Sequence, residues 1–429
     1  MKGFSVESLL PFLKVLAAFV VMLAGIRLRA GIGPSILGGG FVLAMLFGMS
    51  IPSWAVTGMH ALTHEKFLFL IAIVGLILVL SDAMERSGQS RRLMDALSGY
   101  LQSPRLRLVF FPALIGMLPM PGGAVFSAPM VKTVSEGMRV SNSDRAVVNY
   151  WFRHVWEVCW PLYPGIILTV SLADITIIEL ISKTWPGTLA MIGAGWFFFL
   201  RPGVLGAGEL MAQPIPSGGK KRIVLREGLP LLVAIGGAIG LEGLISVFVP
   251  SVDFEWGVVV ALGGGVICVM VQNTSLGMPF LRDVITRKSV WSMLFVIVAI
   301  FVFKDVMQAA GVVEEMARVS GGGAALFAAA VFLPFLVGLV AGINVAFVGA
   351  TFPLLLGLLS NMGMDAQVVP YLILATFAGF TGVMVSPIHI CFILTCQYFG
   401  CDLMGTWRKL VLPCVVLMSS GALLFWIWL

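Results

Sequence analysis

A few ionisable residues lie within long apolar segments of this sequence. Arg153 and Glu157 are four positions apart, a spacing at which two side chains share one helix face and can pair, and His154 lies between them. His389 lies in a second apolar segment and, because imidazole titrates near neutral pH, could carry a proton. The alternatives are an interfacial salt bridge for the first pair and a hydrogen-bonded structural role for His389.

Prolines, glycines and small polar residues interrupt four apolar segments. The interruptions comprise Pro121, Gly122, Gly123 and Ser127; Pro161, Tyr163 and Gly165; Asn344 and Thr351; and Ser386, Pro387 and His389. A helix that restarts after a break points the positive end of its dipole at the gap, so four converging ends would bind an anion. Freed carbonyl groups could instead hold Na⁺. Simple kinks or close helix packing are the alternative for any one break.

Other chemistry is not predicted. His60 and His64 have the spacing of a helical metal site, but two ligands on a loop do not make one, so no metal site is expected. The 6 cysteines form no CxxC pair and are interpreted as small core residues. The sequence contains no P-loop, and no pair of potential catalytic residues has a suitable spacing. We therefore expect neither an ATP-driven pump nor an enzyme, and we assign no catalytic residues.

Composition limits the elements that can position these residues. The chain has 429 residues, of which 59% are hydrophobic and 11% charged, against about 25% charged in a soluble domain. This excludes a soluble enzyme, a nucleic-acid-binding protein and a disordered chain. We expect an all-α integral membrane protein with about ten crossings. They fall at 8–28, 32–50, 66–85, 144–171, 183–200, 228–249, 256–272, 289–306, 367–397 and 409–429.

Two apolar segments, 106–138 and 322–361, are too long for one plain helix and are broken in the middle by glycine or proline. We interpret each as a re-entrant hairpin, which is tolerated only where the broken backbone is buried in protein or lines a cavity. With both hairpins re-entrant, most of the 27 basic residues fall on one face of the membrane. This predicts a multi-pass protein of the cell inner (plasma) membrane with both termini outside.

The two halves resemble each other in sequence. Pro161-Leu162-Tyr163 corresponds to Pro387-Ile388-His389, and the segment around Asp82 corresponds to that around Asp305. We expect a first repeat at 1–200, a cytoplasmic linker at 201–226 and a second repeat at 227–429. Each repeat holds an odd number of crossings, so the second must be inverted. Inverted repeats with broken helices are typical of secondary transporters.

This organisation resembles the ion transporter superfamily, and the closest similarity is to its branch called domain of unknown function 401. The segment Leu118-Pro119-Met120-Pro121-Gly122-Gly123-Ala124 is also similar to a Pro- and Gly-rich stretch of gluconate permeases. The resemblance implies an elevator-type carrier, in which one hairpin and one broken crossing per repeat slide past a scaffold. It also implies a homodimer formed through that scaffold.

The sequence therefore predicts a secondary active transporter for a small organic anion, a carboxylate or sugar acid, coupled to H⁺ or Na⁺. Its expected partners are the anionic substrate, membrane lipid and a second copy of the chain, with no nucleic acid and no cofactor other than Na⁺. Two alternatives remain. A cation/H⁺ antiporter would use Glu157 as its buried carboxylate, and a membrane scaffold would not transport at all.

Overall fold

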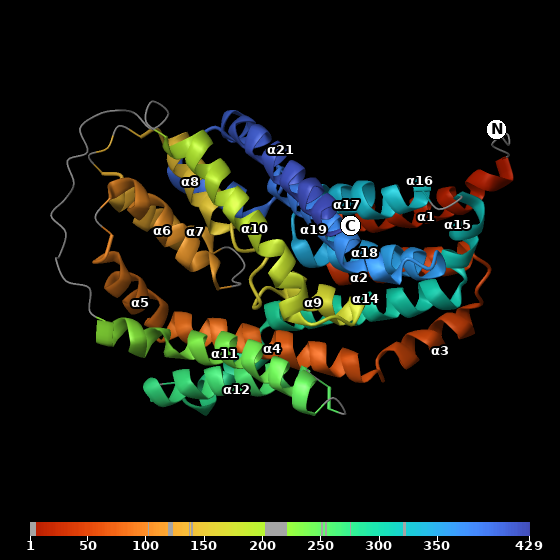
Figure 1. The fold of residues 1–429 in the computed structure, drawn as a ribbon, viewed down its shortest axis with the longest axis horizontal. Helices are drawn as coiled ribbons and strands as arrows, with labels where there is room; N and C mark the ends of the chain where they lie inside the picture. Colours follow the sequence, from red (N-terminus) through yellow and green to blue (C-terminus); the bar gives the residue numbers. More distant parts are fainter. Residues whose placement is uncertain are drawn as a thin grey trace.

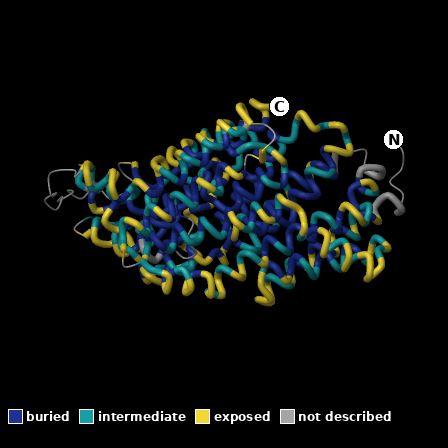
Figure 2. Tube along the Cα trace, turned by 90° about the horizontal axis from the view of Figure 1, so that it is seen from below, coloured by how far each residue is buried: buried dark blue, intermediate teal, exposed yellow. Residues whose placement is uncertain are grey.

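The computed structural model describes residues 6–101, 103–118, 123–136, 138, 140–201, 221–249, 252–253, 255–274, 276–320 and 323–429. Every regular element in these residues is a helix (Figure 1). The all-α prediction is thus confirmed for the described part of the chain. The buried segments concentrate in the middle of the molecule, and exposed residues lie around its margin (Figure 2).

Six long helices pack in a row that forms one layer. In spatial order they are α1 (Val6–Arg27), α2 (Ile32–Leu46), α14 (Lys288–Ala309), α4 (Glu65–Arg86), α12 (Glu255–Gln272) and α11 (Lys221–Phe248). The two ends of the row have the same arrangement. Helix α2 packs between α1 and α14, just as α12 packs between α11 and α4. We call these helices the outer row. The shorter α3 (Ile51–Ala61) and α13 (Met278–Thr286) both contact α14.

The remaining helices build a second layer, here called the inner layer. From the first half it contains α5 (Gln89–Ser98), α6 (Pro104–Gly116), α7 (Ala124–Val134), α8 (Asn142–Arg153), α9 (Pro164–Ala173), α10 (Ile177–Gly195) and the π-helix η1 (Trp196–Leu200). From the second half it contains α15 (Val312–Ser320), α16 (Gly323–Phe327), the π-helix η2 (Ala328–Phe332), α17 (Leu333–Ala341), α18 (Asn344–Asn361), the 3₁₀ turn η3 (Asp365–Gln367), α19 (Val368–Met384), α20 (Ile390–Phe399) and α21 (Leu403–Trp428).

The two halves exchange partners within the inner layer. Helix α9 of the first half packs on α18 of the second, and α20 of the second half packs on α7 of the first. The pair α6–α7 lies toward one end of the long axis, and α16–α18 lie toward the other (Figure 1). Each half therefore completes its packing only with helices of the other half.

Each predicted crossing coincides with one helix or with two helices separated by a break. Among the described residues, 8 helices are long and apolar enough to cross a membrane. One of them is Asn344–Asn361, inside the segment interpreted as the second hairpin, so re-entry of 322–361 stays a prediction. Helix α11 begins at Lys221, within the predicted linker 201–226, and residues 202–220 of that linker lie outside the described residues.

Ion pairs lie near both ends of the helices, some within one layer and some between the two layers. At one end, Asp82 pairs with Arg86 at 3.0 Å and also with Arg287. At the other, His64 Nε2 lies 3.0 Å from Asp305 Oδ2. Further pairs join Arg92 to Glu227, Lys409 to Asp144, Lys66 to Asp174 and Lys14 to Glu315. Apart from Lys14, which lies inside the first predicted crossing, the paired residues lie at helix ends that the predicted topology places on the same side.

Close packing of α17 on α19 predicts a sensitive position. A Cβ atom added to Gly382 would lie 2.1 Å from the carbonyl oxygen of Phe335, so the two helices would have to separate. We expect Gly382→Val to lower the free energy of unfolding by about 1–3 kcal/mol, measured by thermal unfolding in detergent. Gly236→Ala is the matched control, because no atom lies within 4 Å of the added Cβ. Equal stability of the two variants would contradict this packing.

Candidate functional site

Two crossings of the inner layer are interrupted where the sequence predicts. Helix α8 ends at Arg153, and the chain continues through non-helical turns until Pro164 starts α9. Helix α19 ends at Met384, and α20 begins at Ile390 after the exposed Pro387. Proline lacks the amide hydrogen that a helix interior needs and is tolerated in a first turn, so these residues set where each helix stops and restarts.

A buried charged cluster lies at the first break. Arg153 Nη1 lies 3.9 Å from Glu157 Oε1, and His154 Nε2 lies 3.6 Å from the same oxygen. The side chains of Arg153 and Glu157 are only 3% and 10% exposed. The predicted pair does form, but not on one helix face, because Glu157 lies beyond the end of α8. Charges this deeply buried are tolerated when they are paired and hydrogen-bonded.

The second half contributes to the same cluster through the start of α18. Asn344 Nδ2 donates a hydrogen bond of 2.6 Å to Glu157 Oε2. Gly165, in the first turn of α9, lies against the same asparagine: an added Cβ would be 3.2 Å from Asn344 Cβ. The break of one repeat and the tip of the other repeat's predicted hairpin therefore meet.

The first predicted hairpin closes over Arg153. A Cβ atom on Gly123 would lie 2.6 Å from Arg153 Nη2, so a larger residue there would displace the guanidinium. Tyr163 donates a hydrogen bond of 2.5 Å from its hydroxyl to the carbonyl oxygen of Gly116, at the end of α6. Pro121 and Gly122, which were also predicted at this tip, lie outside the described residues.

The second break brings His389 to the cluster. Its ring centroid lies 4.9 Å from that of His154 and 5.3 Å from that of Tyr150, and the residue is 6% exposed. Ser386, beside it, donates a hydrogen bond of 2.7 Å to the carbonyl oxygen of Leu339 in α17. The break is thus anchored to the helix before the second tip.

Some residues predicted for the site do not join the cluster by hydrogen bonds. The Ser127 hydroxyl bonds to the carbonyl oxygen of Ala124 at 3.2 Å, and the Thr351 hydroxyl bonds to that of Phe347 at 2.7 Å. Each therefore satisfies its own helix. Pro161 is buried within the turns after α8. It shapes the site by interrupting the helix.

Asn149 belongs to the site although it was not predicted. Its Nδ2 atom donates to the carbonyl oxygen of Ala124 at 2.9 Å and to Thr395 Oγ1 at 3.2 Å, which joins α8 to α7 and α20. Its Oδ1 atom is buried with no hydrogen-bond partner among the described residues. The position four residues before Arg153, on the same helix face, is the sequence feature that could have identified it.

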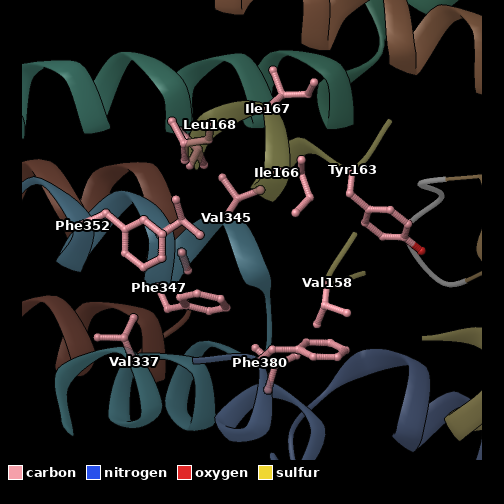
Figure 3. Close-up of a cluster of buried hydrophobic side chains, with 14 of the residues drawn as sticks. Val158, Tyr163, Ile166, Ile167, Leu168, Val337, Val345, Phe347, Phe352 and Phe380 are labelled. Carbon is pink, nitrogen blue, oxygen red and sulfur yellow. The ribbon is translucent and has the colours of Figure 1, made fainter. Parts of the chain in front are cut away.

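An apolar wall backs the cluster on the side of α9, α18 and α19. Val158 and Tyr163 lie near Ile166, which faces Val345 of α18, and Phe380 of α19 lies below (Figure 3). These residues are all buried. Such a wall excludes water, which strengthens the electrostatic interactions of the charges next to it.

The four helix starts at the breaks surround this cluster. They are the first turns of α7, α9, α18 and α20, which begin at Ala124, Pro164, Asn344 and Ile390. Free backbone N–H groups and the positive ends of helix dipoles favour an anion at such a position. The arrangement can therefore hold a negative charge in addition to Glu157.

A cavity of about 810 Å³ lies between the outer row and the first predicted hairpin. Its lining includes Glu85 at the end of α4, Arg91 and Asp95 of α5, and Leu118, the last described residue before the first tip. The cavity thus extends from a charged rim toward the tip that covers Arg153.

Eight apolar helices and a charged cluster buried at helix breaks define a multi-pass helical membrane protein. A family model described as "Protein of unknown function (DUF401)" matches residues 9–206 and 235–428, and the chain belongs to this family. The two matched segments follow the predicted repeats. No curated protein matches the chain.

The hydrogen bond between the two halves yields a prediction for stability. Asn344→Ala removes the amide that donates to Glu157 and leaves a buried carboxylate with one donor fewer. We expect a loss of about 1.5–3 kcal/mol, the range for hydrogen bonds to charged groups, in thermal unfolding of the purified protein. Asn361→Ala, at the exposed end of the same helix, should change little. A loss of similar size in both variants would argue against the bond.

Proposed function

We propose that the protein is a secondary active transporter for a small organic anion, a carboxylate or sugar acid. The observation that carries this proposal is the buried cluster of Arg153, Glu157, Asn344 and His389, assembled from both halves at breaks in apolar helices. Substrate sites at the interface of two repeats, built from discontinuous helices, are the common plan of secondary transporters. A scaffold without transport has no need of such a costly arrangement.

Recognition of the anion would centre on Arg153. Its planar guanidinium suits a carboxylate, which it can bind through two parallel hydrogen bonds. Arg153 Nη1 lies 3.9 Å from Glu157 Oε1, so a substrate carboxylate would compete with Glu157 and Tyr163 for the guanidinium. The starts of α7 and α18 would add partial positive charge. A sugar acid is one candidate substrate, suggested by the resemblance of the short segment 118–124 to a stretch of gluconate permeases.

Coupling would use the same cluster. Glu157 and His389 can each exchange a proton, and carbonyl groups freed at the breaks can hold Na⁺. A second candidate function follows from Glu157 itself, because a buried carboxylate with an adjacent arginine is also what a cation/H⁺ antiporter needs. The two functions differ in whether an organic anion binds.

An elevator mechanism would move the inner layer against the outer row. The cavity of about 810 Å³ between α4–α5 and α6–α7 supports such a movement, because it leaves space between α4 of the outer row and the first predicted hairpin at the end predicted to be cytoplasmic. It would form the exit path of an inward-open state. The exposed apolar side chains of Val260, Ile267 and Val271 on α12 fit contact with lipid or with a second copy in a scaffold dimer.

The anion proposal predicts ligand-dependent stabilisation. Purified protein would be tested against a panel of monocarboxylates, dicarboxylates and sugar acids, with and without Na⁺. A true ligand at about 100 times its Kd should stabilise the folded state by about 2.7 kcal/mol. Arg153→Gln should abolish the shift, whereas Arg408→Gln, at the exposed start of α21, should retain it.

Substrate counterflow in proteoliposomes would then establish transport of any ligand found. If no anion on the panel shifts the unfolding temperature, or if the shift survives in Arg153→Gln, the proposed site is wrong.

The antiporter alternative is separated by Glu157→Gln. In proteoliposomes with a pH gradient, an antiporter would exchange Na⁺ or K⁺ for H⁺, and the neutral glutamine would stop the exchange. We expect no such exchange from the wild-type protein. Exchange that is present in the wild type and lost in Glu157→Gln would favour the antiporter over the anion transporter.

The re-entrant hairpins predict a labelling pattern. In a background with the part-exposed Cys268 and Cys401 replaced by serine, a membrane-impermeant maleimide should reach Arg91→Cys and Thr133→Cys from the same side. Glu314→Cys and Asn361→Cys should both react from the opposite side. These positions are exposed; Arg91 and Glu314 precede the two hairpins, and Thr133 and Asn361 lie near their C-terminal ends. Labelling of either flanking pair from two different sides would show that the hairpin between them crosses the membrane.

A further inference from the structure

Two imidazoles and a thiol meet beside the charged cluster. The possible ligand atoms of His154, His389 and Cys391 all lie within 4.8 Å of one another, and all three residues are buried. His154 comes from the first break, whereas His389 and Cys391 come from the second break and the start of α20. The anion proposal assigns no role to Cys391.

The hydrogen bonds of His154 orient its ring for metal binding. Nδ1 lies 2.6 Å from the carbonyl oxygen of Tyr150, which can only accept, so Nδ1 carries the proton. The lone pair is then on Nε2, the atom that faces Glu157. Metal-binding histidines are fixed in the same way, with the other ring nitrogen donating to a carbonyl or carboxylate group.

His389 supplies a second, independent observation. Its Nδ1 atom is buried and has no hydrogen-bond partner among the described residues. A buried polar atom without a partner costs about 1–3 kcal/mol and calls for an explanation, such as a bound ion. A ligand near the ring would remove that cost.

We propose that His154, His389 and Cys391 bind a transition-metal ion of the zinc class. One thiolate and two imidazoles are ligands that favour Zn²⁺ or Cu⁺ over the oxygen-seeking Mg²⁺ and Ca²⁺. With bonds of about 2.0–2.3 Å, tetrahedral zinc holds its ligand atoms about 3.5 Å apart. The three ligand atoms would therefore have to approach one another by at most about 1.3 Å from the 4.8 Å limit.

Binding would convert the Cys391 thiol to a thiolate and release its proton, because the thiolate is the ligand form. The fourth coordination position remains open. Glu157, whose Oε1 atom lies 3.6 Å from His154 Nε2, can fill it, as can a water molecule or a substrate oxygen. The ion would link the two breaks directly and would remove His389 as a proton carrier while it is bound. The proposal does not depend on which substrate is carried.

The test uses the full-length protein produced in medium supplemented with Co²⁺, so that the ion is available while the buried site folds. Tetrahedral Co²⁺ replaces Zn²⁺ and gives a thiolate-to-metal charge-transfer absorption band. We expect about one ion per chain, the stoichiometry of a single four-coordinate site, and this band in the purified wild-type protein.

Cys391→Ser should remove the band, and His389→Gln should reduce the bound metal at least tenfold. Cys414→Ser is the matched control, because Cys414 is equally buried but outside the group, and it should keep the band. A folded wild-type protein without bound Co²⁺ or Zn²⁺, or a band that survives in Cys391→Ser, would overturn the proposal. The wild-type result decides the question even if one variant fails to fold.

Discussion

Burying an arginine and a glutamate away from water costs several kcal/mol for each ion unless both find partners. Arg153 and Glu157 are buried together, and their compensation comes from elements that are remote in sequence. Asn344 donates to the carboxylate, while Gly123 allows the start of α7 to approach the guanidinium. The starts of α7 and α18, which follow the two predicted hairpin tips, thus both lie against this one pair of charges. The other helices of the inner layer pack around the pair.

The distribution of charge over the molecule follows the same constraint. The pairs around Asp82 and Asp305 lie near helix ends, where water and neighbouring ions share the electrostatic cost. In the middle, where the helices are apolar, polar chemistry is concentrated at the two breaks. When the polar groups are gathered at the breaks, the same helix ends, amides and rings can form hydrogen bonds or ion pairs with several of them. Such a connected network is more favourable than separate partners for each group.

Local rules made part of this structure predictable. Proline disfavours a helix interior, so breaks near Pro161 and Pro387 could be predicted from the sequence. The same rule does not locate every break, because Pro186 and Pro413 lie inside continuous helices. The partners across those breaks depend on tertiary packing. The bond from Asn344 to Glu157 joins residues 187 positions apart, and no local pattern announces it. Ser127 and Thr351 were predicted as ligands, yet a hydroxyl in a helix can bond back to its own carbonyl groups, and both do. Cys391 was interpreted as core packing because a thiol in an apolar run carries no mark of its neighbours.

The exchange of partners between halves has a consequence for biosynthesis. Helices α7 and α9 emerge from the ribosome long before α20 and α18, on which they pack. Until the last quarter of the chain has been made, Glu157 lacks its amide donor and the first break lacks its cover. The nascent first half must wait in the insertion machinery or bilayer with an incomplete polar centre. Such a chain reaches its final arrangement only after synthesis. The time during which it can misfold or aggregate increases with the number of residues that separate the two halves.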